Sequence, residues 1–225
     1  MQFKDLNNKE KFEHIVYYYK WHIVLGIIGI LCVISLIYTM FFKPPIENYC
    51  GIAMYGQFLS FDTEDNIQQE LADLVEAPEN YRVSVDSYYS DEDDPTVESD
   101  LNQKFNTYLF ANQYQLVITN EDYIKGFYDE KNDQDVAGLA ESEALYPLAA
   151  YFTNEQIEEL KNKYGLIYAV NPETGKEDAF GICLKNSAIL DKYELFKDKT
   201  PYIAFVPQPS EYTEKTMKTL QQFLK

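Results

Sequence analysis

The stretch WHIVLGIIGILCVISLIYTMFF, residues 21–42, decides how the chain is organised, because it contains no charged side chain. As a helix rising 1.5 Å per residue it extends over about 33 Å, enough to cross a hydrocarbon core of about 30 Å. A core helix of a soluble protein is the alternative, but such helices seldom sustain this length without a polar face. The sequence therefore predicts a single transmembrane helix with a short segment, residues 1–20, before it.

The lysines on either side of this span predict its orientation. Four lysines precede the span, and after it only Lys43 occurs before Arg82. Because basic residues are retained in the cytoplasm, the N-terminus is expected there and residues 44–225 outside. A cleaved signal peptide would have a shorter apolar region and a small-x-small site, which residues 38–43 do not offer. We therefore expect an uncleaved signal anchor in the cell membrane.

The charge of the outer segment excludes one class of partner. The first 43 residues hold five lysines and three acidic residues, which leaves 14 basic and 34 acidic residues after them and a net charge of −20. A surface of this charge repels the phosphate backbone, so we exclude nucleic acid as a partner. The general effect of such charge is solubility.

One outer domain is predicted after the span. Lys43-Pro44-Pro45 begins a short stiff linker, residues 43–48, and the length of residues 49–225 suits a single core. Cys50 and Cys183 are the two cysteines outside the span, and the sequence leaves open whether they pair.

Strand and helix patterns alternate along this domain. Strands are predicted at residues 49–55, 81–85 and 114–118, with helices between them at residues 62–75, which Asp62 can cap, and 96–111. In the second half, the sequence predicts a helix opened by the capping box Thr153/Gln156, a β-hairpin over residues 166–184, a strand at 202–206 and a helix at 211–224. Helices between strands favour right-handed βαβ crossovers. The predicted fold class is α/β, with a mixed, largely parallel sheet flanked by helices.

The order of these elements resembles a known family. The stretches at residues 116–122, 145–148, 151–153 and 180–184 are similar to strand, loop and hinge segments of extracellular solute-binding proteins of ABC transporters. The resemblance implies a domain like one lobe of such a protein, because the chain is too short for two. The Tyr-Tyr-Lys-Trp-His entry to the span, residues 18–22, resembles N-terminally anchored membrane proteins of unknown function from Gram-positive bacteria.

Motifs for catalysis and metal binding are not found in the sequence. Both histidines, His14 and His22, precede or enter the span, so the outer domain cannot assemble a Ser–His or Cys–His pair. Neither acidic run, at residues 91–94 or 129–135, follows the EF-hand pattern, and both are interpreted as solvated loops. We expect no enzyme, no cofactor and no metal site. A cell-wall hydrolase using two carboxylates is the weaker alternative.

Aromatic and polar side chains fall where the predicted parallel strands end, which is where open α/β sheets bind ligands. These candidate binding residues are Tyr55, Gln57, Tyr88, Tyr89, Thr119 and Asn120. Their rings, amides and hydroxyls could stack on and hydrogen-bond a small neutral or cationic ligand, or contact a protein. The alternative is that the tyrosines only supply half-buried surface.

The sequence thus predicts a non-enzymatic, membrane-anchored extracellular binding or interaction module. Its partner would be another membrane or envelope protein, as for an accessory component of a transporter or envelope complex. A small-ligand-binding solute receptor is the alternative function. A single lobe favours protein contact, because closure between two lobes is what buries a ligand in such receptors.

Overall fold

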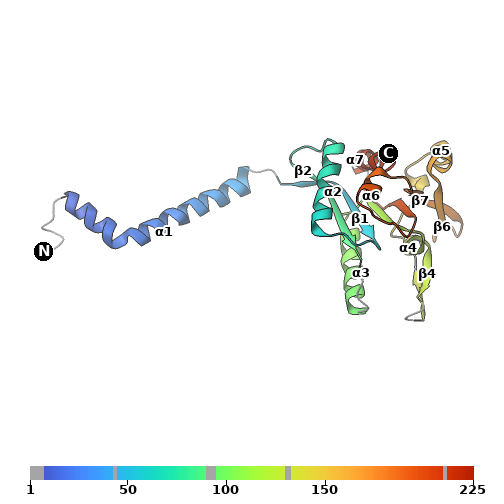
Figure 1. Ribbon diagram of the computed structural model, residues 1–225, viewed down its shortest axis with the longest axis horizontal. Coiled ribbons are helices and arrows are strands. Elements are labelled where there is room, and N and C mark those ends of the chain that lie inside the picture. The colour runs from blue at the N-terminus through green and yellow to red at the C-terminus, as the bar shows by residue number, and fades with distance from the viewer. Residues whose placement is uncertain (1–7, 43–44, 90–94, 130–132, 210–211) are drawn as a thin grey trace. The chain divides into compact units, whose positions relative to one another are not determined.

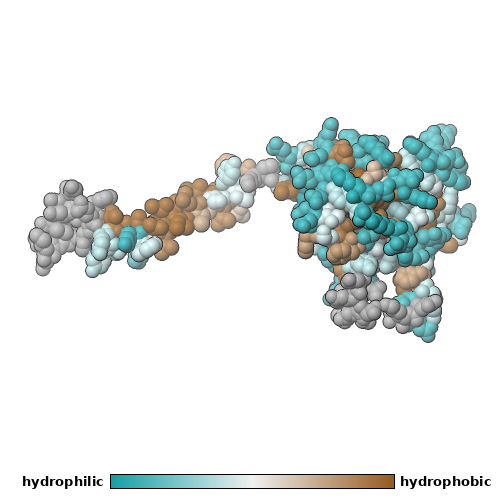
Figure 2. Space-filling view, viewed as in Figure 1, coloured by the Kyte–Doolittle hydropathy of each residue, from teal (hydrophilic) through white to brown (hydrophobic). Residues whose placement is uncertain are grey.

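The computed structural model describes residues 8–42, 45–89, 95–129, 133–209 and 212–225, and the chain divides into two compact units after Pro45. The first unit contains helix α1 (Asn8–Phe42), of which residues 16–42 are long and apolar enough to cross a membrane. None of these side chains is buried in protein, and Figure 2 shows them as a hydrophobic stretch. Helix α1 begins before the predicted span, within the segment that was expected to precede it.

The second unit, residues 46–225, is a mixed α/β domain built on a six-stranded sheet (Figure 1). The strands of this sheet are β1 (Glu47–Tyr55), β2 (Tyr81–Tyr88), β3 (Leu116–Asn120), β6 (Leu166–Val170), β7 (Glu177–Cys183) and β8 (Pro201–Phe205). The helices are α2 (Phe61–Leu74), α3 (Pro95–Phe110), α4 (Glu121–Lys125), η2 (Leu148–Ala150), α5 (Asn154–Tyr164), α6 (Ala188–Lys192) and α7 (Thr213–Phe223). A separate hairpin consists of β4 (Gly126–Asp129) and β5 (Gln134–Ala137).

The strand order of the sheet is β2-β1-β3-β8-β7-β6. Strand β1 runs parallel to β2 and β3, whereas the β3–β8, β8–β7 and β7–β6 pairs are antiparallel. A mixed sheet was predicted, but its parallel character is limited to three strands. The short connection between β6 and β7 allows only antiparallel pairing, since parallel strands need a longer crossover.

Side-chain alternation along the strands creates a core on each face of the sheet. Ile52 and Met54 of β1 pack in one cluster with residues of α2, α6 and α7, while Ala53 faces a second cluster with α3 and α4. Helices α2 and α3, which connect the three parallel strands, therefore lie on opposite faces.

Local signals in the sequence explain several elements. The Thr153/Gln156 capping box at the start of α5 and the β6–β7 hairpin are both present, as predicted. Helix α2, however, is capped by Ser60 rather than Asp62, because Ser60 Oγ accepts a hydrogen bond from Thr63 N at 3.2 Å. Strand β1 begins at Glu47, inside the predicted linker. Hairpin β4–β5 and helix α6 were not predicted.

The two cysteines of the domain do not form a disulfide. Cys50 lies in β1 and Cys183 in β7, and strands β3 and β8 separate them in the sheet. Three strand spacings amount to about 14 Å, about twice the Cα separation that a disulfide can bridge. Both cysteines are free thiols.

Candidate functional site

The carboxyl ends of β2, β1 and β3 lie at one edge of the sheet and bring several of the predicted binding residues together. Tyr55 is opposite Tyr88 in the strand register, and their rings stack with centroids 6.3 Å apart. Thr119 Oγ1 donates a hydrogen bond to the Tyr55 carbonyl oxygen at 2.9 Å. The strand order reverses between β1 and β3, so this point is the topological switch where open α/β sheets bind ligands.

The side chain of Tyr123 occupies the switch point. Its ring lies edge-on against the Tyr55 ring, with centroids 4.9 Å apart. It also covers Gly56, whose φ is +80°, and a Cβ on Gly56 would lie 2.3 Å from Tyr123 Cε2. Glycine is thus required here both by the backbone conformation and by the close ring. The protein itself fills the position that a small ligand would take.

Asn120 holds Tyr123 in this position. Its Oδ1 accepts hydrogen bonds from Asp122 N at 3.0 Å and Tyr123 N at 3.5 Å, which caps the short helix α4. Asn120 is 3% exposed and Thr119 is fully buried. Both predicted binding residues therefore have structural contacts inside the domain and almost no accessible surface for a partner.

Tyr88 is also a core residue, with 3% of its surface exposed. Its hydroxyl lies 2.5 Å from that of Tyr114, which donates to Asp86 Oδ2 at 3.0 Å. Burial raises the pKa of both phenols above their usual range, so they stay protonated. The neighbouring Tyr89 is 42% exposed, and of the six predicted residues it is the one with most accessible surface.

Gln57 connects this edge to a second feature, the loop at residues 193–200. Gln57 Oε1 accepts a hydrogen bond from Phe196 N at 2.8 Å, and Lys199 Nζ lies 2.7 Å from Asp122 Oδ2. These two contacts fix the loop beside β1 and α4. Glu194 and Phe196 have φ values of +58° and +53°, a conformation that such contacts must stabilise in residues other than glycine.

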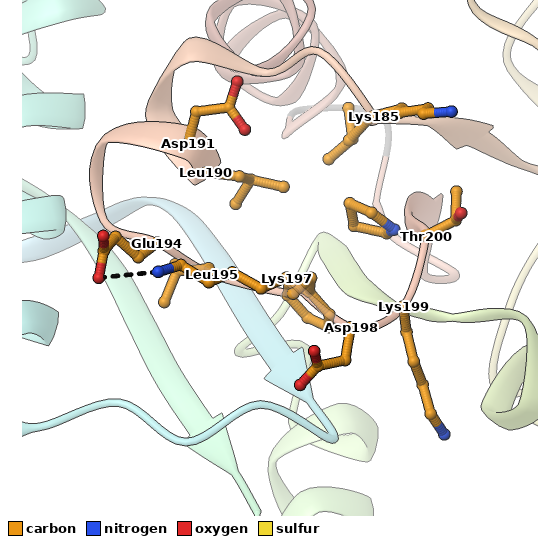
Figure 3. Close-up of a pocket in the computed structure, with 12 residues that line it drawn as sticks. Lys185, Leu190, Asp191, Glu194, Leu195, Lys197, Asp198, Lys199 and Thr200 are labelled. Atoms are coloured by element: carbon orange, nitrogen blue, oxygen red, sulfur yellow. Dashed lines mark ion pairs between the residues drawn. The ribbon is translucent and has the colours of Figure 1, made fainter.

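The loop encloses a pocket of about 360 Å³ (Figure 3). Its apolar part includes buried leucines, of which Leu190 and Leu195 are labelled in the figure, and charged side chains surround it. Glu194 and Lys197 form an ion pair of 3.0 Å, and Asp191 and Asp198 offset Lys185 and Lys199. Because acidic and basic groups are balanced, the pocket has no strong preference for a charged ligand.

Two carboxylates near this edge, those of Glu64 and Asp86, have partners inside the domain. Glu64 Oε1 accepts from Ser87 N at 3.1 Å, and Asp86 accepts from the Tyr114 hydroxyl. Burial raises the pKa of Glu64, and the charge of Asp86 adds to this effect. Among the described residues, no group of three or more His, Cys, Asp or Glu side chains could hold a metal ion. The acidic run at 91–94 lies outside the described residues.

An exposed aromatic surface lies next to the filled switch point. Phe58 is 61% exposed and its ring meets that of Tyr89 edge-on, with centroids 6.4 Å apart. Phe61, the first residue of α2, is 87% exposed. Phe61 is near this pair in sequence, three residues after Phe58, and we call Phe58, Phe61 and Tyr89 the edge patch. Phe58 and Phe61 were not among the binding residues predicted from the sequence. Two phenylalanines in the polar stretch GQFLSFDTED are nevertheless a pattern that indicates exposed aromatic side chains.

The chain matches no protein-family model, no curated protein and no solved structure. Fold and site together define a mixed α/β domain joined to an N-terminal apolar helix. The resemblance to one lobe of a solute-binding protein stays a prediction.

Proposed function

We propose that this chain is a membrane-anchored, non-enzymatic interaction module whose outer domain contacts another membrane or envelope protein. Helix α1 is long and apolar enough to serve as the anchor. The lysines before the apolar run support a cytoplasmic N-terminus and a domain outside the cell.

The observation that carries the proposal is the exposed aromatic surface of Phe58, Phe61 and Tyr89, which lies beside a switch point that Tyr123 fills. Large aromatic side chains are enriched at the centres of protein interfaces, where they supply much of the binding energy. Phe58 and Phe61 are 61% and 87% exposed, and grouped exposed apolar side chains are typical of interaction surfaces. The edge patch therefore supports contact with a protein.

The alternative functions have less support. A solute receptor needs an open polar and aromatic cavity, whereas the predicted binding residues Tyr88, Thr119 and Asn120 are buried. A cell-wall hydrolase needs a pair of carboxylates that can reach a substrate, and the pair near the switch point, Glu64 and Asp86, accepts hydrogen bonds within the domain. We expect no turnover of glycan or peptide substrates by the purified chain.

The size of the native complex tests this proposal. Membranes are solubilised in a mild detergent, and the complex is compared for the wild-type chain and a variant with Phe58→Ser, Phe61→Ser and Tyr89→Ser. We expect the wild type to migrate above its monomer mass and the variant to lose this association. Phe110→Ser is the matched control, because Phe110 is 83% exposed but belongs to the far end of α3. Monomeric wild type, or equal association of all three chains, would contradict the proposal.

A further inference from the structure

The sheet has two outermost strands, β2 and β6, and they differ in how their free sides are covered. On β2, side chains of α2 bind the backbone: Glu64 Oε1 accepts from Ser87 N at 3.1 Å, and Gln68 Nε2 donates to Val85 O at 3.4 Å. Proteins cover an outermost strand because its unpaired N–H and C=O groups otherwise attract the strand of another chain. The β2 side of the sheet is therefore protected.

Strand β6 lies at the other side of the sheet, where it pairs with β7 (Figure 1). Gly165 O accepts from Cys183 N at 3.0 Å, and Asn171 N donates to Lys176 O at 2.8 Å, so the backbone faces β7 just before and just after the strand. Along an antiparallel strand, successive residues direct their backbone groups to alternate sides. The residues of β6 that direct N–H and C=O away from β7 are Leu166, Tyr168 and Val170.

The free side of β6 lacks the usual protection. Within the described residues, no hydrogen bond reaches the outward backbone groups of Leu166, Tyr168 or Val170. The strand sequence, LIYAV, contains neither a charged residue nor proline, and the extra residue in the β6–β7 ladder, Phe180, belongs to β7. Val170 is also 58% exposed. An uncharged outermost strand with free backbone groups is a template for one further strand.

We propose that β6 pairs with β6 of a second copy of this chain, antiparallel and with Tyr168 opposite its counterpart. In this register Tyr168 exchanges both hydrogen bonds with its counterpart, and Leu166 does so with Val170 in each direction. All outward N–H and C=O groups of the two strands are then paired, whereas a shift along the strand leaves some without a partner. The contact is isologous, because the same strand contributes on both sides.

Charges at the two ends of β6 favour a second copy as the partner. Lys163 and Glu173 lie five residues before and five residues after Tyr168, and both are exposed. Neither forms an ion pair within the described part of the chain. Antiparallel pairing brings Lys163 of each copy to the end of the contact where Glu173 of the other copy lies, whereas parallel pairing would bring like charges together. The strand and its flanks are thus complementary to themselves.

The contact is small, and the anchor compensates for this. A single pair of short strands buries little surface, and small interfaces bind weakly between free proteins. Two copies held in one membrane by helix α1 are concentrated relative to each other, which raises the paired fraction. This step rests on the membrane anchor proposed above. The edge patch follows β1 and β2 on the other side of the sheet, so the two contacts are independent.

Disulfide trapping in isolated membranes, before detergent is added, tests the pairing. Tyr168→Cys is introduced into a full-length chain in which Cys32 and Cys183 are replaced by alanine, while the buried Cys50 is kept. Residues opposite each other in a hydrogen-bonded antiparallel pair have Cα atoms about 5.5 Å apart, which a disulfide can span. We expect a reducible dimer on a denaturing gel. Recovery of the chain outside the membrane fraction would contradict the anchor, and a membrane-bound chain without a dimer would overturn the pairing.

Val170→Cys is the matched control for the register. Its counterpart lies four residues away along the paired strands, about 13 Å, so this chain should not crosslink. Adding Leu166→Cys places a cysteine opposite it and should produce the dimer. Equal crosslinking of Tyr168→Cys and Val170→Cys would reflect random collision and would overturn the proposal. An adduct of a different mass from Tyr168→Cys would show that another protein occupies β6 and would overturn the second copy as its partner.

A charged side chain on the free side of β6 should weaken the contact. In the Tyr168→Cys chain, Val170→Lys should lower the crosslinked fraction about threefold or more, because lysine on an outermost strand opposes pairing. Leu74→Lys is the matched control, since Leu74 is 45% exposed on α2, and it should leave the crosslinked fraction unchanged. The serine variant of the edge patch should also crosslink like the parent chain. An undiminished dimer with Val170→Lys, or an equal loss with Leu74→Lys, would overturn the proposal.

Discussion

The ring of Tyr123 meets the ring of Tyr55 edge-on, with centroids 4.9 Å apart, at the carboxyl ends of the neighbouring parallel strands β1 and β3, where the strand order reverses. In an open α/β sheet this is the place for a ligand, because the connecting helices leave on opposite faces there. The chain fills the position with its own side chain. The neighbouring exposed aromatics of the edge patch are therefore the stronger candidates for binding at this edge.

Gly56→Ala should destabilise the outer domain strongly. The substitution forces alanine into a left-handed conformation, at about 1–2 kcal/mol, and the new methyl group collides with Tyr123. Gly175→Ala is the matched control, because Gly175 has φ +67° and no atom within 4 Å of its added Cβ. Chemical unfolding of the full chain should show that Gly56→Ala lowers the free energy of unfolding by about 1 kcal/mol or more beyond the decrease caused by Gly175→Ala.

A double-mutant cycle locates the cause of that difference. In a Tyr123→Ala background the collision is gone, so Gly56→Ala should lower the free energy of unfolding no more than Gly175→Ala does. An undiminished cost in that background would show that Tyr123 does not close the switch point.

Tyr88 and Tyr89 should differ sharply although they are adjacent. Tyr88→Ala removes a buried ring that packs on Tyr55 and Phe105 and should cost about 3–5 kcal/mol of unfolding free energy. Tyr89→Ala changes an exposed side chain and should cost less than about 1 kcal/mol. Equal losses in chemical unfolding would show that the burial of these two residues is assigned wrongly.

The sequence predicts much of the fold but only part of the site. The uncharged run at residues 21–42, the βαβ alternation and the β6–β7 hairpin follow from local periodicity and turn residues. The packing of Tyr123 on Gly56 does not, because it joins residues far apart in the chain through a helix of one turn. Strand alternation puts Tyr88 and Tyr89 on opposite faces, but which of them is buried depends on where α3 packs.

Alkaline pH should destabilise the domain through the Tyr88–Tyr114 pair. Burial raises the pKa of both phenols in the folded state, whereas in the unfolded chain they ionise near pH 10. The folded state thus retains protons that the unfolded state loses, and stability falls as pH rises above about 10. In Tyr88→Phe/Tyr114→Phe the decline should be less steep, as measured by urea unfolding between pH 8 and 11. An identical pH profile would contradict the burial of these hydroxyls.

Protease added to intact cells should digest the outer domain and spare the N-terminus. The lysines before the apolar run are the reason for this expectation. With epitope tags at both ends, the C-terminal tag should disappear and the N-terminal tag should survive on a short fragment. Survival of the C-terminal tag alone would reverse the proposed orientation.

Site-specific photo-crosslinking in intact cells tests the central claim most directly. A photoreactive amino acid replaces Phe61 in one chain and Phe110 in a control chain, since both positions are more than four-fifths exposed. The proposed protein contact predicts a single adduct of defined mass from position 61, either with another protein or with a second copy. This adduct should disappear when Phe58→Ser and Tyr89→Ser are added, and position 110 should give none. No adduct from position 61, or the same adducts from both positions, would contradict the claim that the edge patch binds a protein.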